Sequence, residues 1–201
     1  TEDGLARSVQ LFQQAVTADP EFAKAYAAMA AAYVTLGTYG ALAPGAAMSQ
    51  TRAAAGRALD IAPDLADAYA ARAEMHYEEG DLQLAMRDFA RALVLEPTSV
   101  RALVGLAVIR ASVNELDQAI ELLNRALEQS PEDLSAIHNR ALVRYARGEF
   151  EDAIEDFASV LEQEGDNGEA WLNRANAYAE MGNFERALED ATKASELLSD
   201  S

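Results

Sequence analysis

The spacing of proline and alanine along this chain constrains its fold more than any other feature of the sequence. Pro63, Pro97 and Pro131 stand 34 residues apart, and Gly165 keeps the same step. Three columns of mostly small residues share this period: Ala73, Ala107, Ala141 and Ala175; Ala85, Ala119, Ala153 and Ala187; and Ala92, Ala126, Val160 and Ala194. A fixed period of this length means that each unit is one supersecondary element, which buries its apolar face only by stacking on its neighbours. The sequence therefore predicts a repeat architecture whose function depends on a surface.

Each unit has the pattern of two helices joined by a short turn. Apolar residues recur every three or four positions in both halves of residues 66–97, as expected for helices that bury one face. A glycine separates the halves in three units, at Gly80, Gly148 and Gly182, and Asn114 takes that place in a fourth. Glycine and asparagine most readily end a helix in the left-handed conformation. Because no stretch alternates like a strand, the sequence predicts an all-α fold of about eleven helices.

The last unit carries a resemblance to a known family. It contains Ala170-Trp171-Leu172-Asn173-Arg174-Ala175-Asn176-Ala177-Tyr178, followed by Gly182-Asn183-Phe184 and Ala187. This pattern resembles the consensus of a tetratricopeptide repeat (TPR), and several of its columns agree over five units. The resemblance implies a right-handed superhelical α-solenoid of helix-turn-helix repeats that acts as a scaffold for binding proteins.

The resemblance divides the chain into one array spanning residues 1–201. Residues 3–20 correspond to the second helix of a half repeat, and full repeats are expected at 23–65, 66–99, 100–133, 134–167 and 168–201. Because the half repeat lacks its first helix, we expect the chain to be a fragment of a longer protein.

One repeat departs from the period. Pro20 and Pro63 are 43 residues apart, nine more than the usual 34. The excess lies around residues 37–45, where glycines and Pro44 favour a loop over a longer helix. Tyr39 and Leu42 in this loop are candidate contact residues. An alanine-rich first repeat with this insertion also resembles TPR arrays in bacterial regulatory proteins that carry kinase, cyclase or winged-helix domains.

The charge of the chain limits its partners. It has 34 acidic and 16 basic residues, for a net charge of −18. Such a field repels phosphate backbones and anionic membrane surfaces. We therefore expect a neutral or basic protein segment as partner, and no nucleic acid.

Membrane insertion and disulfides are not expected either. The sequence contains no cysteine, and no apolar run approaches the length of a membrane span. No segment has the order of a signal peptide, although one could have been removed before Thr1. These features favour a cytoplasmic location.

Amide side chains are the leading candidates for peptide binding. In this family the first helix of each repeat lines the concave groove, and Asn139 and Asn173 take the same groove position in successive repeats. Asn176 follows Asn173 by one helical turn. A primary amide can bridge the N–H and C=O groups of an extended peptide. This pair resembles the asparagine ladder of O-linked N-acetylglucosamine transferases; the alternative is that these amides are solvated or bond to neighbouring helices.

Further groove positions complete the predicted site. They are His138, Tyr145, Arg101, Glu74 and Tyr77. The N-terminal part of the groove is lined by small residues, which would admit a helix or an apolar peptide. The alternative for that part is tight packing that leaves no open groove.

A chaperone-type carboxylate clamp can be tested against the sequence. The best register begins at residue 100, where Val104 and Val108 replace the required lysine and asparagine. Asn139 fits the third position, but Glu169 and Asn173 replace the last two basic residues. One match in five positions predicts that no such clamp is present.

Metal binding and catalysis find no support in the sequence. His76 and His138 are the only histidines, and they fall on first helices two repeats apart, too far to share a metal. His76 is expected to pack within its repeat. Residues 164–169 have a calcium-like composition without EF-hand spacing, so a turn is the simpler reading. Without a phosphate loop or a nucleophile motif, we expect no cofactor, no metal and no enzymatic activity.

Two features leave alternatives open. An acidic run on a predicted second helix is read either as a solvated convex face or as a dock for a basic partner; it comprises Glu149, Glu151, Asp152, Glu155 and Asp156. In the predicted array Leu5 and Phe12 lack their partner helix, and Leu197-Leu198 close the chain without a polar capping helix. The second functional reading is therefore a structural module, which spaces other domains or forms a homodimer through its open ends.

Overall fold

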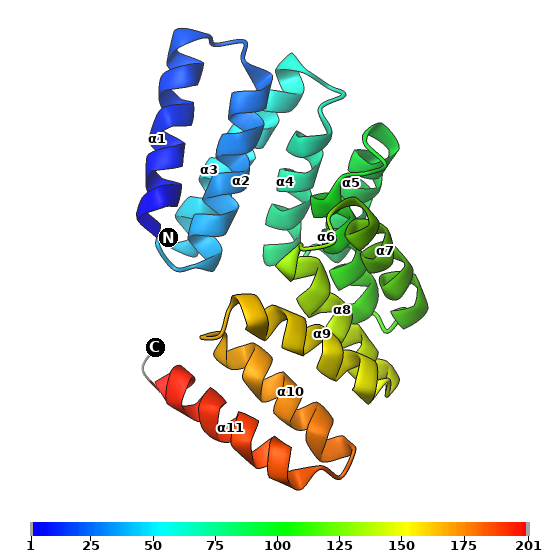
Figure 1. Ribbon diagram of the computed structural model, residues 1–201. Coiled ribbons are helices and arrows are strands. Elements are labelled where there is room, and N and C mark those ends of the chain that lie inside the picture. The colour runs from blue at the N-terminus through cyan, green and yellow to red at the C-terminus, as the bar shows by residue number, and fades with distance from the viewer. Residues whose placement is uncertain (1, 200–201) are drawn as a thin grey trace. The chain divides into compact units, whose positions relative to one another are not determined.

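A computed structural model describes residues 2–199 and their side chains from residue 4 onward (Figure 1). Residues 1, 200 and 201 of the predicted array lie outside the described residues. Over the described part the chain forms eleven α-helices and no strand, as predicted: α1 (Glu2–Ala18), α2 (Ala23–Thr38), α3 (Pro44–Ile61), α4 (Ala66–Glu78), α5 (Leu82–Leu95), α6 (Val100–Ser112), α7 (Leu116–Gln129), α8 (Leu134–Arg147), α9 (Phe150–Gln163), α10 (Gly168–Glu180) and α11 (Phe184–Ser199).

The helices fall into two compact units, Thr1–Ile109 and Arg110–Ser201. In the first unit α2 packs on α1, α3 and α4, and α4 also packs on α3 and α5. In the second unit α8 packs on α7, α9 and α10, and α10 also packs on α9 and α11. No helix within residues 2–199 is both long enough and apolar enough to cross a lipid bilayer. The predicted right-handed superhelix concerns the whole array and stays a prediction.

The turns between paired helices follow the sequence prediction. Gly80, Gly148 and Gly182 have φ values of 81°, 79° and 75°. Asn114 has φ 63° and is the one non-glycine residue with positive φ in the described chain. Asparagine tolerates this left-handed conformation better than most residues, which explains why it can replace glycine there.

The predicted loop at residues 37–45 is shorter than expected. α2 and α3 have 16 and 18 residues, against 13 and 14 in α4 and α5, so both helices absorb part of the insertion. Only residues 39–43 are non-helical. Pro44 begins α3, where its missing N–H is no disadvantage. Gly37 stays within α2, and a Cβ added there would lie 2.7 Å from the Cβ of Ala47.

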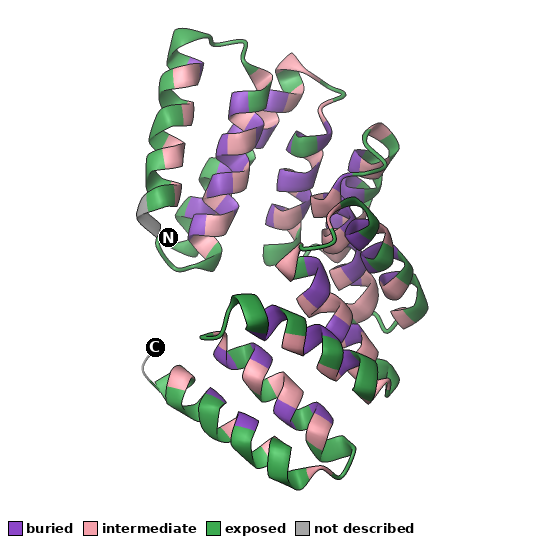
Figure 2. Cartoon of the chain, viewed as in Figure 1, coloured by how far each residue is buried: buried purple, intermediate pink, exposed green. Residues whose placement is uncertain are grey.

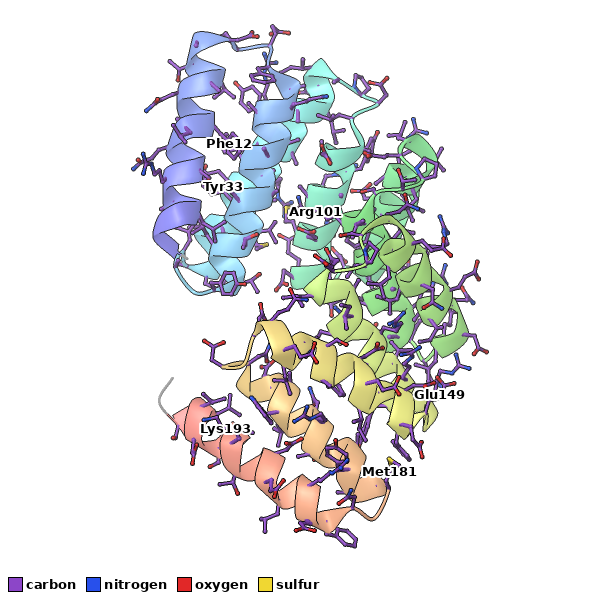
Figure 3. All side chains as sticks on the ribbon, in the orientation of Figure 1. Phe12, Tyr33, Arg101, Glu149, Met181 and Lys193 are labelled. Atoms are coloured by element: carbon purple, nitrogen blue, oxygen red, sulfur yellow. The ribbon has the colours of Figure 1, made fainter. Side chains whose placement is uncertain are left out.

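The core around α2 and α3 is built largely of alanine. Ala30 and Ala55 have no exposed surface, and they form one cluster with Met29, Ala54 and Ala71. Phe12 of α1 and Tyr33 of α2 pack against this cluster (Figure 3). Phe12, expected to lack a partner helix, therefore contacts its own unit and is half-buried.

α5 contributes the largest buried side chain of the first unit. Phe89 is 1% exposed, and a Cβ added at Gly105 of α6 would lie 2.2 Å from its ring. Glycine at position 105 therefore lets the backbone of α6 approach the aromatic ring. Ala73, Ala85 and Ala92, from the predicted columns, are also fully buried.

The second unit likewise buries large side chains between its helices. Phe157 and Val160 of α9 are 0% and 1% exposed, together with Ala141 and Ala153 of the predicted columns. α11 is mostly exposed, like α1, and its buried residues are Asp190 and Ala194 (Figure 2). Leu198 and Leu197 of α11 lie close to Gly168 at the start of α10. Leu197 is half-buried and Leu198 is 46% exposed, so these two leucines contact their own unit only in part.

An arginine–aspartate pair joins the two helices in three repeats. Arg72 bonds Asp88, Arg140 bonds Asp156 and Arg174 bonds Asp190, each through two hydrogen bonds of 2.6 to 3.0 Å. The three aspartates are only 5% to 6% exposed. In each pair the aspartate follows the arginine by 16 residues, from the seventh to the twenty-third position of the repeat.

These pairs correct the interpretation of the acidic run. Asp156 was expected on a solvated face, but it is buried and accepts bonds from both Arg140 and Arg144. Glu151, Asp152 and Glu155 are exposed, as expected. Arg72 and Arg174 keep their charge firmly, because hydrogen bonding to Asp88 and Asp190 raises the pKa of each guanidinium above its ordinary value.

Candidate functional site

The predicted amide pair lies on the neighbouring first helices α8 and α10, which contact each other. Asn139 of α8 is half-buried, and its Nδ2 donates to the carbonyl of Ser135 at 2.8 Å. This bond holds the side chain along its own helix and leaves Oδ1 as an acceptor. One of the two donor hydrogens is thus already used, by a bond within α8 that neither the ladder nor its alternative anticipated.

The other two asparagines lie on α10. Asn173 is half-buried and Asn176 is exposed. Neither side chain forms a hydrogen bond to another of the described residues. A half-buried amide without a hydrogen-bond partner is stabilised when a ligand supplies that partner. Asn173 therefore keeps its full bonding capacity for a ligand.

His138 lies beside Asn139 and packs on α9. Its ring stands edge-on to Phe157, with centroids 5.8 Å apart and an interplanar angle of 72°. Its Nδ1 is buried and has no hydrogen-bond partner within the described residues. Burial lowers the pKa of His138 below its ordinary value, although Glu169 and Glu164 partly oppose this shift. The ring is therefore neutral at pH 7.

A pocket of about 270 Å³ opens next to His138 and Asn139. It lies between α8, the end of α9 and the start of α10, and it is lined by Leu134, Ser135, His138, Asn139, Val160, Glu164, Asn167 and Glu169. The turn before α10 is fixed by Asn167, whose Oδ1 accepts from the N–H of Ala170 at 3.0 Å. Its Nδ2 donates to Glu164 at 3.0 Å. This confirms the predicted turn and shows that it also forms one wall of the pocket.

The role of Glu164 and Glu169 in a pocket was not predicted from the sequence. Glu164 was assigned only to a turn, and Glu169 was considered beyond that turn only as a residue of the wrong charge for a carboxylate clamp. The pocket forms because the end of α9 and the start of α10 meet α8 at His138. The available signal was the pair of acidic residues flanking the turn that replaces the expected proline.

Tyr145 and the loop residues differ in their freedom to bind. Tyr145 is half-buried and packs edge-on against Phe150, with ring centroids 5.6 Å apart, so it is held at the turn of its repeat. In the first unit, Tyr39 is 68% exposed. Leu42 is half-buried, and its N–H donates to the carbonyl of Leu36. Of the two predicted loop contacts, Tyr39 is the more accessible.

The other predicted groove residues lie in the first unit. Arg101 of α6 and Glu74 of α4 form an ion pair with two hydrogen bonds. Burial opposes the charge on Arg101, but its hydrogen bonds and attraction to Glu74 outweigh this effect and raise its pKa. Tyr77 is 36% exposed. Arg101 and Glu74 therefore satisfy each other's charge and hydrogen bonds. Tyr77 has the most exposed side chain of the three.

His76 has the packing role that was predicted, but its neighbours were not foreseen. Its side chain is 14% exposed, and its Nε2 lies 3.9 Å from Oδ2 of Asp88. Its ligand atoms and those of Glu79 and Asp81 lie within 4.8 Å of one another, a group that could hold a metal ion. No metal site was predicted here, because Glu79 and Asp81 belong to the inter-helix turn. Glu79 also accepts a hydrogen bond from Arg52, which competes for that carboxylate.

The repeated hairpins, with their left-handed turns and buried alanine columns, define an α-helical repeat protein. The tetratricopeptide repeat family model matches residues 76–142 and 144–189, which is more than half of the chain. The chain therefore belongs to the tetratricopeptide repeat family. Members of this family generally act as interaction scaffolds without catalytic activity.

Solved structures agree with this assignment. YrrB, described as a TPR protein with an unusual peptide-binding site, has a TM-score of 0.64 and 23% identity; the match covers 94% of this chain and 93% of YrrB. MamA has a TM-score of 0.67 and 21% identity, covering 78% of this chain and 91% of MamA.

A third match is to part of a longer protein. A human IFIT1 dimer with m7Gppp-AAAA has a TM-score of 0.75 and 20% identity, covering 94% of this chain and 46% of IFIT1. No curated protein sequence matches the chain. At these identities the structural matches establish the fold alone.

Proposed function

We propose that the protein is a non-enzymatic scaffold, which binds a peptide segment of another protein along α8 and α10. The observation that carries this proposal is the unused bonding capacity of Asn139 and Asn173 on two helices in contact. An extended peptide crossing both helices would offer each amide a backbone N–H or C=O group. Asn176 and Tyr145 lie on the same two helices and would flank the peptide.

The charge of this unit supports a protein partner of neutral or basic character. Residues 110–201 carry 21 acidic and 8 basic side chains, for a net charge of −13. Such a surface repels a phosphate backbone, so a nucleic acid like the one in the IFIT1 structure is a poor ligand for this chain. YrrB is a protein of the same fold with a described peptide-binding site, which makes this mode of use reasonable.

A peptide array tests the proposal. The wild-type chain and the double variant Asn139→Ala/Asn173→Ala would be applied to the same array of random sequences. Loss of two backbone contacts should weaken the bound peptides about tenfold. The matched control is Gln118→Ala/Gln129→Ala, which removes two exposed amides from the second helix α7. Equal binding by wild type and the asparagine variant would contradict the proposal.

Self-association is the second candidate, and α11 provides the observation that favours it. Phe184 and Leu188 are 72% and 70% exposed on this helix. Large apolar side chains at the surface can mark an interface. If the chain dimerises there, Phe184→Ser/Leu188→Ser should convert a dimer into a monomer in sedimentation velocity. A wild-type monomer at high concentration would exclude this candidate.

A further inference from the structure

The pocket beside Asn139 differs in chemistry from the rest of the amide surface. Its volume of about 270 Å³ is below the range of roughly 300–1,000 Å³ typical of sites for whole small molecules. A single long side chain is a better match for such a space. The question is then which side chain its walls and charges would accept.

Both carboxylates of the pocket are exposed, and neither forms an ion pair with a basic residue within residues 2–199. Glu164 accepts from the neutral amide of Asn167, and Glu169 has neither an ion pair nor a hydrogen bond within the described residues. The buried carboxylates of the same unit are different, since Asp156 and Asp190 each bind arginine. His138 adds no positive charge at neutral pH, because burial keeps its ring unprotonated. The pocket therefore carries two negative charges.

The remaining walls suit an aliphatic stem. Leu134 and Val160 line the pocket; Val160 is almost fully buried, so the half-buried Leu134 offers most of the apolar surface. Lysine and arginine bury their methylene stems on apolar surface while the charged head stays near polar groups and water. Carboxylates in a pocket with low-dielectric walls concentrate their field there and attract cations.

We propose that this pocket binds a lysine or arginine side chain of the peptide ligand, with the stem against Leu134 and the charged head between Glu164 and Glu169. The proposal rests on the proposed function, because Asn139, which lines the same pocket, would hold the peptide backbone beside it. It adds a requirement that the amides cannot impose, since they contact only backbone. The ligand must carry a basic residue at one fixed position.

The test is a positional library of capped peptides with lysine, arginine, citrulline or norleucine at one position. Norleucine keeps the stem of lysine without its charge, and citrulline does the same for arginine. Wild type should bind the basic peptides about tenfold more tightly than their neutral counterparts. Glu164→Gln/Glu169→Gln should reduce this preference below about twofold and leave the neutral peptides unchanged. The Glu164→Gln substitution keeps an oxygen that can accept the hydrogen bond from Asn167.

A matched control separates the pocket from the overall field. Glu151→Gln/Glu155→Gln changes the net charge by the same amount on exposed positions of α9. This control should keep the preference for basic peptides. Equal loss in both double variants would overturn the proposal, because the long-range field alone would then explain the preference.

Three other outcomes are informative. Peptides that depend on Asn139 and Asn173 but show no preference for a basic residue would overturn the pocket proposal and leave the peptide-binding function intact. Binding of no peptide at all would overturn both. Calcium binding by the free protein, abolished in Glu164→Gln/Glu169→Gln, would overturn the proposal in favour of a metal site.

Discussion

The hairpins α2–α3 and α10–α11 have the same plan but different chemistry at equivalent positions. The seventh and twenty-third positions of the repeat, allowing for the insertion, are Met29 and Ala54 in the first hairpin and Arg174 and Asp190 in the second. Met29 and Ala54 belong to an apolar cluster, whereas Arg174 and Asp190 form a hydrogen-bonded ion pair. Only one other repeat lacks the ion pair at these positions, and it carries Leu106 and Leu122.

The difference shows that the TPR hairpin accepts two kinds of contact between its helices. Alanine packing has no polar group to satisfy, but it leaves no room for added volume. A buried ion pair tolerates no loss of one partner, because the remaining charge is then stranded. The two kinds of contact should therefore fail in response to different substitutions. Three predictions test this contrast, and a fourth concerns the pH response of the second unit.

The largest effect is expected where one aspartate serves two arginines. Asp156→Ala removes the acceptor of Arg140 and Arg144 and should lower the free energy of unfolding by about 3–5 kcal/mol, measured by urea denaturation. Glu151→Ala, on the exposed side of the same helix, should change it by less than about 0.5 kcal/mol. Similar values for both would mean that the ion pairs do not hold α8 to α9.

Added volume should be damaging in the alanine-packed hairpin. Ala55→Leu puts three extra carbons into a position with no exposed surface, which should cost about 1–3 kcal/mol in the same measurement. Ala53→Leu lies on the exposed side of α3 and is the control, with an expected change below about 0.5 kcal/mol. A harmless Ala55→Leu would show that this interface has unused space.

The pH response of the second unit should depend on His138. Its pKa is lower in the folded chain than the ordinary value of 6.5, so the unfolded chain binds more protons as the pH falls through this range. Stability is therefore full above about pH 6.5 and declines below it, by less than in the two preceding predictions. Replacing His138 with glutamine should flatten the curve between pH 7 and 5.5. An unchanged slope would exclude His138 as the cause.

The smallest effect is expected when both partners of a pair are removed. Arg174→Leu/Asp190→Leu copies the leucines found at positions 106 and 122 of this chain and should leave the free energy of unfolding within about 1 kcal/mol of wild type. Arg174→Leu alone should be much worse, since Asp190 would stay buried without a partner. If the double variant is as unstable as the single one, the two interface types are not interchangeable.

Features set by local backbone preference could be predicted well from sequence. The helix turns at Gly80 and Asn114 followed from the residues that accept positive φ, and the buried alanine columns followed from the 34-residue period. The length of the inserted loop could not be predicted, because composition does not show how many residues the flanking helices absorb.

Interactions between separate segments were harder to predict. The burial of Asp156 was missed because its charge was compared with neighbours on the same helix, whereas its partner Arg140 lies 16 residues earlier. The pocket with Glu164 and Glu169 depends on three segments meeting, and no repeat column marks it. The amides Asn139 and Asn173 could be placed on neighbouring helices from the period alone, but their hydrogen bonds could not.

The position of each ion pair within its repeat has a consequence for how such chains can change length. Arginine and aspartate both belong to one 34-residue unit, so a duplication or deletion of whole units moves them together. If the break falls outside the segment between the arginine and the aspartate, such a rearrangement leaves no buried charge without its partner. Gain and loss of repeats, the ordinary route by which tandem arrays evolve, is thereby uncoupled from the electrostatic balance of the interior.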